Sequence, residues 1–245
     1  MQLVKHLKGH SGASISLYDD NNTYKVVKNN FKNAKASAFI LDHLPFNTPQ
    51  VYSVTSTRIE MEYINGLDMA TFLTNASKKD TYKLIDFLFD YINYCLNNSN
   101  PYNFKKELDV KIQNLKPFIN LNELKKDYDY CMPKSLIHGD FTLENIIFFD
   151  DKFYLIDANP TDLSSIHFDA NKLRQDIDSF WFVRDKKPSL ELRMNCLVIS
   201  KELKKRFTFM NKDTIFILML SRILPYTKEQ KTEIFLKNEI QKLWP

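Results

Sequence analysis

The sequence contains very little glycine. Only 4 of its 245 residues are glycine, whereas average usage of about 7% would give roughly seventeen. The four are Gly9, Gly12, Gly66 and Gly139. Because glycine permits positive φ angles and close approach of the backbone to a ligand, we expect a chain that avoids it elsewhere to keep these four for backbone reasons. Any one of them alone also fits an ordinary turn.

Cysteines and long apolar segments are scarce as well. The three cysteines, Cys95, Cys131 and Cys196, lie far apart and form no Cys-x-x-Cys pair. This spacing argues against a disulfide framework or a zinc site and favours a reducing compartment. The longest apolar run, residues 215–220, is too short to cross a bilayer, and residues 1–10 lack the apolar stretch of a signal peptide. We therefore predict a cytoplasmic protein that does not insert into a membrane.

The chain has no large excess of charge of either sign. Lys and Arg number 34 and Asp and Glu 30, which gives a formal net charge of +4 at pH 7. Basic stretches such as residues 201–206 are interrupted by apolar residues, as on a solvated helix face. Nucleic acid is therefore not an expected partner. With 44% hydrophobic and 26% charged residues, the composition is that of a globular protein that buries a core.

Hydrophobic periodicity predicts a strand-rich first part, residues 1–66. Four segments have the residue types and boundaries of strands: 15–18, 23–28, 51–54 and 58–63. The first two are expected to form a hairpin about the turn at residues 19–22. Helical spacing covers residues 32–44, and the prolines that follow end this helix.

The second part, residues 67–245, is predominantly helical in pattern. Seven segments have helical spacing of apolar residues: 77–97, 104–115, 121–130, 170–183, 190–207, 212–224 and 229–243. Ser77 with Asp80 three residues later resembles an N-cap. The fold class is therefore α+β, with a small antiparallel-sheet lobe at residues 1–66, a hinge at residues 61–66 and a larger helical lobe at residues 67–245.

The densest group of chemically useful residues lies in LIHGDFTLENIIFFDDKFYLID, residues 136–157. Asp140 falls in a loop, Asn145 follows five residues later, and Asp157 ends the apolar strand at residues 153–156. Phosphoryl transfer to a hydroxyl group needs a carboxylate that accepts the proton and oxygen ligands that hold magnesium. Asp140 fits the first role, and Asn145 and Asp157 fit the second.

Each of these residues also has an ordinary interpretation. A single aspartate in a loop is more often a turn or cap residue than a catalytic one, and a Gly-x-x-Gly pair such as Gly9 to Gly12 is frequent. The order of the whole set favours catalysis. A glycine loop, a hairpin with a lysine, a helix and a strand ending at residues 61–63 precede residues 136–157, and unrelated turns are not expected to produce that order.

The segments HGDFTLEN, residues 138–145, and LID, residues 155–157, resemble the catalytic core of the aminoglycoside phosphotransferase and choline kinase superfamily. These enzymes are small-molecule relatives of the protein kinases, and by motif order the resemblance covers residues 8–182. It implies a protein-kinase-like fold with two lobes, with ATP and magnesium as cofactors. Asp140 is then the catalytic base, and Asn145, also in the catalytic loop, binds magnesium together with Asp157.

The resemblance also assigns nucleotide-binding residues. Lys28 matches the phosphate-binding lysine of the Val-Ala-Ile-Lys strand of kinases, and Lys25, its competitor, points to the opposite face of the strand. At the hinge, backbone groups of Glu62 and Ile64 would bind adenine. The glycine loop implies three further cofactor-binding residues: Gly9, Ser11 and Gly12.

The sequence departs from the kinase pattern at three places. Kinases carry a glutamate on the helix after the lysine. Here the matching position lies near Ser37, and no glutamate occurs between Asn29 and His43. Lys28 is therefore held in another way, or activity is reduced. Thr142 replaces the lysine that protein kinases have two residues after the catalytic aspartate, which argues against a protein kinase. The third departure is DAN, residues 157–159, in place of Asp-Phe-Gly.

Asp169 resembles the aspartate that braces the catalytic loop in this superfamily. It is also a candidate N-cap for the helix predicted from residue 170. The sequence DANKL, residues 169–173, adds a narrower likeness to relatives found with bacterial capsule and surface-polysaccharide enzymes.

These observations predict a magnesium- and ATP-dependent phosphotransferase acting on a hydroxyl of a small metabolite, with a sugar favoured. Residues after Asp178 are more basic than acidic, which fits a neutral or anionic acceptor better than a polycationic aminoglycoside. The sequence does not show which side chains face the cleft, and three carboxylates would count against this expectation if they line it: Glu144, Asp162 and Asp176. Two alternatives stay open: a nucleotide-binding pseudokinase, and a partner-binding protein on the same fold. The sequence does not indicate an oligomeric state.

Overall fold

The structure is a computed structural model that describes residues 1–7, 13–115 and 129–243. Two compact units make up the chain. The first, here called the sheet unit, comprises Met1–Met69, His138–Asp140 and Glu144–Thr161. The second, the helical unit, comprises Ala70–Ile137, Phe141–Leu143 and Asp162–Pro245. Residues 144–157, which hold two of the candidate site residues, thus belong to the sheet unit by their contacts.

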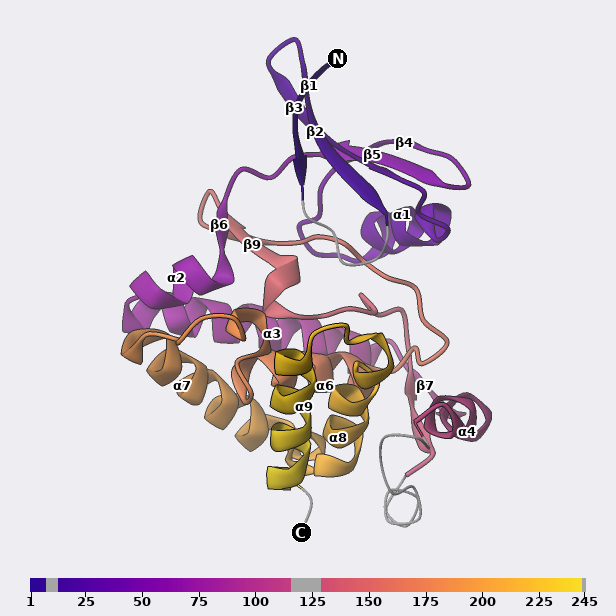
Figure 1. The fold of residues 1–245 in the computed structure, drawn as a ribbon, viewed down its shortest axis with the longest axis vertical. Helices are drawn as coiled ribbons and strands as arrows, with labels where there is room; N and C mark the ends of the chain where they lie inside the picture. Colours follow the sequence, from indigo (N-terminus) through magenta and orange to yellow (C-terminus); the bar gives the residue numbers. More distant parts are fainter. Residues whose placement is uncertain (8–12, 116–128, 244–245) are drawn as a thin grey trace. The chain divides into compact units, whose positions relative to one another are not determined.

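The sheet unit is built on a five-stranded antiparallel sheet with strand order β1-β2-β3-β5-β4 (Figure 1). Its strands are β1 Gln2–Leu7, β2 Ser14–Asp20, β3 Thr23–Asn29, β4 Val51–Val54 and β5 Arg58–Glu62. The β2–β3 hairpin forms as predicted, because Asn21 and Asn22 adopt the left-handed φ angles of 53° and 67° that a tight hairpin turn requires. Strand β1 was not predicted, since this largely exposed edge strand has no clear alternation of apolar and polar residues.

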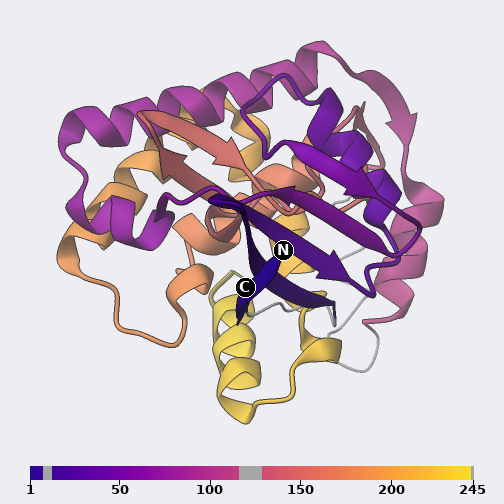
Figure 2. The same cartoon turned by 90° about the horizontal axis from the view of Figure 1, so that it is seen from above.

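Helix α1, Ala34–His43, packs against β4 and β5 within this unit (Figure 2). It buries Ala34, Ala38 and Leu41, and Ile59 of β5 is fully buried beneath the sheet. The helix ends before Pro45, in agreement with the sequence.

A second, smaller sheet carries the central segment. It contains β6 Leu67–Asp68, β9 Ile146–Phe149 and β10 Lys152–Leu155, in the order β10-β9-β6. Asp150 and Asp151 close the β9–β10 hairpin with φ angles of 48° and 56°, a conformation that aspartate tolerates better than most residues. Asn47, in the loop after α1, accepts a hydrogen bond from the N–H of Leu155 at 2.8 Å and so ties β10 to that loop.

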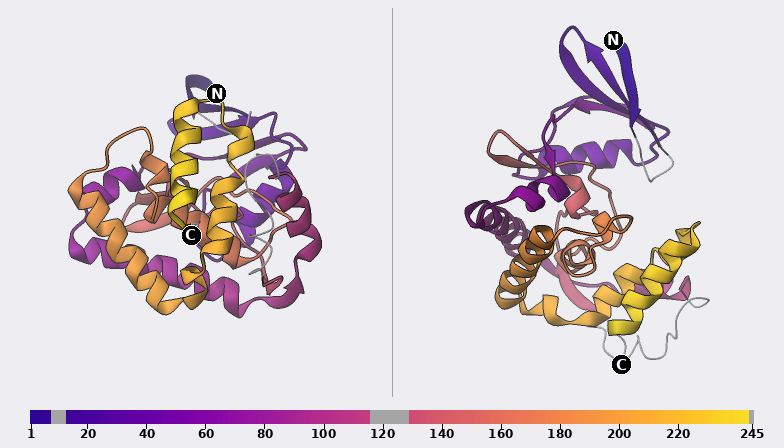
Figure 3. Two further views of the ribbon diagram at one scale, coloured as in Figure 1. Left: turned by 60° about the horizontal axis from the view of Figure 1, so that its bottom comes forward. Right: turned by 60° about the vertical axis from the view of Figure 1, so that its left-hand side comes forward.

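The helical unit contains most of the helices (Figure 3). They are α2 Met69–Asn75, α3 Lys78–Asn97, α4 Lys105–Gln113, α6 Ile166–Ile177, α7 Leu190–Arg206, α8 Asp213–Ser221 and α9 Gln230–Leu243. A two-stranded ladder, β7 Asn100–Asn103 with β8 Cys131–Lys134, and four short 3-10 turns, at Leu143–Asn145, Trp181–Val183, Thr208–Asn211 and Leu224–Tyr226, complete the described elements. Phe104, Phe168, Phe216 and Leu236 are central to its hydrophobic core.

The mixed architecture confirms the predicted α+β class, with a five-stranded antiparallel sheet and a helical part. Ser77 caps α3 in a reciprocal capping box with Asp80, as predicted. Residues 121–128 of the predicted helix 121–130 lie outside the described residues. None of the described helices is both long and apolar enough to span a bilayer. The boundary between residues 66 and 67 stays a prediction.

The helix predicted at residues 170–183 is wrong at both ends. Helix α6 begins at Ile166, with Ser165 as its N-cap, so that Asp169 lies inside the first turn and is not the cap. The helix ends at Ile177, and Phe180 adopts a left-handed φ of 57°. Apolar residues continue through this turn into Trp181–Val183, which is why the pattern alone suggested a longer helix.

Candidate active site

His138 connects the loop that precedes Asp140 to the end of β10. Its side chain is fully buried. Nε2 lies 2.8 Å from the carbonyl oxygen of Ile156, and Nδ1 lies 3.3 Å from the backbone nitrogen of Asp140. Because a carbonyl can only accept and a backbone N–H can only donate, the proton resides on Nε2 and Nδ1 is the acceptor. The neutral imidazole thus fixes the loop against the strand that leads to Asp157.

Gly139 is required by the backbone at this place. Its φ is +80°, and a Cβ atom there would overlap the carbonyl oxygen of Asn159. The N–H of Asn159 also donates to the carbonyl of His138 at 2.9 Å. The close approach of these two backbone segments explains why a chain so poor in glycine has one here.

We expect Gly139→Ala to unfold at a markedly lower temperature than the parent chain. The left-handed conformation alone costs a residue with a side chain about 1–2 kcal/mol, and the overlap with Asn159 adds to this cost. Thermal unfolding measured by circular dichroism tests the expectation. Ala76→Gly, in the loop before α3, is the control, because it exchanges the same two residue types in the opposite direction. An unchanged melting temperature for Gly139→Ala would contradict this account of the loop.

Asn145 holds the backbone and the side chain of Asp140. Its Nδ2 donates to the carbonyl oxygen of Asp140 at 2.8 Å and to Oδ2 of the same residue at 3.1 Å. These bonds engage the amide NH₂ and leave the side-chain carbonyl oxygen available to a cation. The backbone carbonyl of Asn145 accepts from Ile156 at 3.0 Å, so that Asn145 also contacts the strand that leads to Asp157.

Asp157 follows β10 with a left-handed φ of 57°. Its Oδ1 lies 2.5 Å from Nζ of Lys28, and this contact joins residues 129 positions apart in the sequence. The Lys28 side chain is only 3% exposed, whereas that of Asp157 is 42% exposed. The lysine also lies over the ring of Phe31, 3.9 Å from its centroid. The lysine of this ion pair is thus shielded from solvent, whereas the carboxylate is accessible to solvent.

Lys25 lies on the other face of β3, as its odd separation from Lys28 requires. Its Nζ pairs with Asp20 at 2.6 Å and approaches Glu60 at 3.6 Å. Within the described residues Lys28, and not Lys25, reaches the segment that carries Asp157.

The predicted adenine-binding residues lie at and just beyond the end of β5. The N–H of Glu62 donates to Gln50 at 2.9 Å, and that of Tyr63 donates to Tyr24 at 3.1 Å. The N–H of Ile64 has no hydrogen-bond partner among the residues that the structure describes. Of these three backbone groups, Ile64 N–H is therefore the one that a ligand can use. Gly9, Ser11 and Gly12 lie outside the described residues.

The side-chain oxygens of Asp157 and Asn145 are of the kind that suits a hard cation. A half-exposed carboxylate and an amide carbonyl are oxygen ligands of the kind that magnesium binds, usually together with waters and phosphate oxygens. In the described ranges no group of three or more His, Cys, Asp or Glu side chains is placed to hold a metal ion. A metal at Asn145 and Asp157 would therefore take its remaining ligands from waters or from a nucleotide.

Residues 141–143, immediately after Asp140, are held within the helical unit. Phe141 stacks on Tyr91 with ring centroids 4.0 Å apart, and the Tyr91 hydroxyl donates to Asp169 at 2.7 Å. Asp176, two helical turns after Asp169, accepts the N–H of Leu143 at 2.6 Å. Sequence reasoning missed this role. Asp176 was considered as a lining residue of an acceptor cleft, which is wrong because its side chain is fully buried.

Comparison by sequence gives a similarity at low identity. A scan against models of protein families finds no match. Among curated proteins, the chain is 28% identical over 178 residues to a protein named LicA homolog from Metamycoplasma hominis, covering 68% of this chain and 70% of that protein.

Three solved structures are similar over most of the chain. A thermostable mutant of aminoglycoside phosphotransferase APH(4)-Ia has a TM-score of 0.68 at 9% identity, with 99% of this chain and 94% of that chain covered. The ternary complex of APH(2")-IIa with streptomycin and ATP has a TM-score of 0.59 at 14% identity, with 99% and 91% of the two chains covered. A glucosamine kinase has a TM-score of 0.53 at 11% identity, with 95% and 74% of the two chains covered. The chain therefore has the fold of the aminoglycoside phosphotransferases and related small-molecule kinases, which confirms the resemblance at the level of fold.

Proposed function

We propose that this chain is a phosphotransferase that moves the γ-phosphoryl group of ATP to a hydroxyl group of a small molecule, with magnesium as cofactor. The observation that carries the proposal is the contact set within the sheet unit. Lys28 pairs with Asp157, while Asn145 holds Asp140 and, through its backbone, Ile156. A phosphate-binding lysine, two metal ligands and a carboxylate are the parts that phosphoryl transfer requires.

Asp140 is proposed to orient the acceptor hydroxyl and accept its proton. The acceptor oxygen forms a bond to the γ-phosphorus, the bond from that phosphorus to the bridging oxygen breaks, and ADP leaves with the electron pair. Magnesium, held by Asn145 and Asp157, would neutralise the charge on the phosphates. The hydrogen bond from Asn145 Nδ2 to Asp140 Oδ2 fixes one oxygen of this carboxylate.

The nucleotide is proposed to be held at three places. Lys28 would bind phosphate oxygens, and backbone groups of Glu62 and Ile64 would bind adenine. The loop with Gly9, Ser11 and Gly12 would cover the phosphates. The solved complex of a protein of this fold with ATP and streptomycin supports a nucleotide and a hydroxylated acceptor as the ligand classes.

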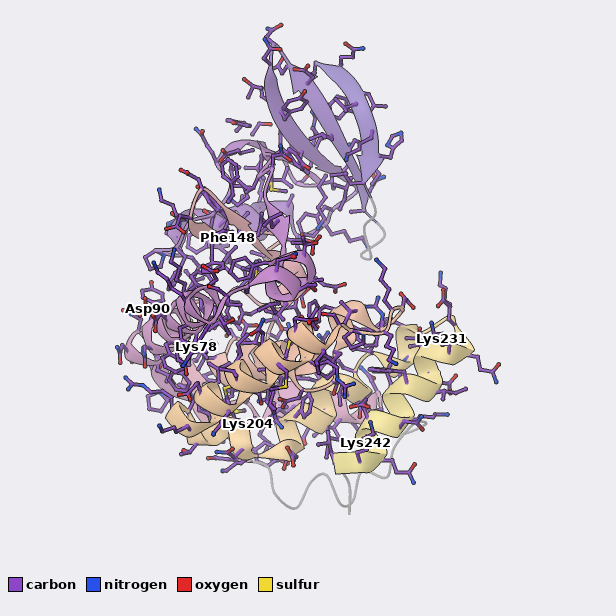
Figure 4. All side chains as sticks on the ribbon, turned by 90° about the vertical axis from the view of Figure 1, so that its left-hand side faces the viewer. Lys78, Asp90, Phe148, Lys204, Lys231 and Lys242 are labelled. Carbon is purple, nitrogen blue, oxygen red and sulfur yellow. The ribbon has the colours of Figure 1, made fainter. Side chains whose placement is uncertain are left out.

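The proposed acceptor is a sugar or a related neutral or anionic metabolite, and the likeness to surface-polysaccharide enzymes remains part of the proposal. In the structure, a local ion pair offsets part of the positive charge in this region. Lys204 of α7, labelled in Figure 4, is paired with Asp178 at 2.8 Å, and Arg174 pairs with the same carboxylate at 2.9 Å. Lys201, Lys205 and Arg206 remain exposed. The similar glucosamine kinase is a sugar kinase by name and supports this class of acceptor.

A panel of acceptors tests the proposal directly. With magnesium and ATP, we expect phosphate transfer to at least one hexose or heptose with kcat/KM above that for any kanamycin-type aminoglycoside. The expected preference follows from repulsion between a polycation and a basic surface. A higher kcat/KM for an aminoglycoside than for every sugar would contradict the acceptor class alone. Magnesium-dependent ATP binding without transfer to any acceptor would favour the pseudokinase instead.

A further inference from the structure

We infer that Ser37 is a positioning residue for Asp157, in the helix where kinases use a glutamate that pairs with the lysine. The inference rests on the proposed function, because Asp157 matters here as a magnesium ligand. It goes beyond that function in assigning a role to α1, a helix with no residue among the proposed catalytic, metal or nucleotide contacts.

Ser37 makes one specific contact. Its side chain is 2% exposed, and Oγ donates to the carbonyl oxygen of Ala158 at 2.6 Å. Ala158, which directly follows Asp157, is fully buried. The bond therefore fixes the peptide unit between Ala158 and Asn159, one residue beyond the metal-binding aspartate.

The N-terminal side of Asp157 is fixed separately. The carbonyl of Ile156 accepts from His138, and its N–H donates to Asn145 at 3.0 Å. Between these two fixed peptide units, Asp157 adopts a left-handed φ of 57°. A residue other than glycine holds this conformation only where the surrounding structure enforces it, at a cost of about 1–3 kcal/mol. Ser37 supplies one enforcing contact on the C-terminal side, where the N–H of Asn159 also donates to His138. His138 and Asn145 supply the contacts on the N-terminal side.

The arrangement also explains how the chain functions without the helix glutamate. Within the described residues, Lys28 has Asp157 as its carboxylate partner and the ring of Phe31 beneath it. Lys28 therefore has a carboxylate partner without an acidic residue at position 37. Helix α1 is linked to the metal-binding segment through a neutral hydrogen bond instead, so the link should be insensitive to salt and to pH near neutrality.

Binding of an ATP analogue with and without magnesium tests the inference. We expect Ser37→Ala to weaken the magnesium-dependent part of nucleotide affinity by about 10- to 100-fold, the loss typical when a group that orients a metal ligand is removed. Affinity measured in the presence of a chelator should stay unchanged, because Lys28 and the hinge are untouched. Ser37→Thr should restore metal-dependent binding to within about threefold, since it retains the hydroxyl donor.

Two further variants separate positioning from packing. Ser37→Cys fills the space of the hydroxyl with a slightly larger group that is only a weak donor. We expect it to lose magnesium-dependent binding as Ser37→Ala does, and it provides the test if the alanine variant folds poorly. Thr74→Val is the matched control, because Thr74 also donates its hydroxyl to a backbone carbonyl, that of Ala70 in α2 at 2.7 Å, but belongs to the helical unit and not to the unit that holds Asp157. It should bind magnesium–nucleotide like the parent chain.

The outcomes distinguish this inference from the proposed function. Parent-like magnesium dependence in both Ser37→Ala and Ser37→Cys would overturn the role of Ser37 and leave the phosphotransferase proposal standing. Equal losses with and without magnesium would also overturn it, because Ser37 would then act on the whole nucleotide site. A parent chain that shows no magnesium-dependent nucleotide binding would overturn the proposed function itself.

Discussion

Replacing Asp140 by asparagine should lower turnover about a hundred- to ten-thousand-fold, the range for loss of a general base, and leave nucleotide affinity nearly unchanged. The amide oxygen of an asparagine can still accept the hydrogen bond that Asn145 donates to Oδ2 at 3.1 Å, so the loop should keep its geometry. What is lost is the group that accepts the proton of the acceptor hydroxyl.

Steady-state kinetics with the best sugar acceptor, together with ATP-analogue titration, checks this expectation. Asp150→Asn is a suitable control, because Asp150 lies at the exposed tip of the β9–β10 hairpin with a φ of 48° that asparagine also tolerates. It should show parent-like kinetics. Turnover of Asp140→Asn within about threefold of the parent, at unchanged nucleotide affinity, would remove Asp140 from the catalytic role.

Asp157→Ala should abolish most of the magnesium dependence of nucleotide binding, and Asn145→Ala should reduce it less. A charged oxygen contributes more to a hard cation than an amide carbonyl does, and the loss should exceed the roughly 10- to 100-fold expected for removing an outer-shell partner. Asp157 also neutralises Lys28, which is 3% exposed. With that competing carboxylate removed, metal-free ATP should bind Lys28 at least as tightly as in the parent chain.

Asp157→Ala should therefore weaken nucleotide binding in magnesium but not in its absence, and a general loss of folding would not produce this difference. Nucleotide affinity is measured by titration in excess magnesium and in excess chelator for both variants and the parent. Asp157→Asn serves as a control of similar shape that retains one oxygen, and we expect it to fall between Asp157→Ala and the parent in magnesium. Equal affinities for all four proteins in both conditions would refute a shared metal site at Asn145 and Asp157.

The sequence alone determined the features that depend on neighbouring residues. The β2–β3 hairpin follows from turn residues that tolerate left-handed φ angles, and the start of α3 follows from the capping pair Ser77 and Asp80. Gly139 could be singled out because glycine is rare in the chain. In each case the interaction spans only a few residues, so its signature remains visible without the fold.

The ends of elements were less predictable where tertiary contacts decide them. Strand β1 is largely exposed and forms because it pairs with β2. The β7–β8 ladder joins segments about thirty residues apart and was not foreseen. Helix α6 starts earlier than its apolar pattern indicates because Ser165 caps it, and it ends before the apolar turn that follows.

At the candidate site, the resemblance to a known family identified residues from the sequence alone. The tertiary structure decided which other residues they contact. No local pattern indicates that Lys28 pairs with Asp157 across 129 residues, or that Ser37 reaches Ala158 across 121. The absence of a glutamate from the helix could be seen in the sequence, whereas the way in which Lys28 is held without it could not. A lone serine on a helix carries no signal for a buried hydrogen bond, because that bond exists only when the sheet unit folds and the Ala158 carbonyl, excluded from water, needs a donor.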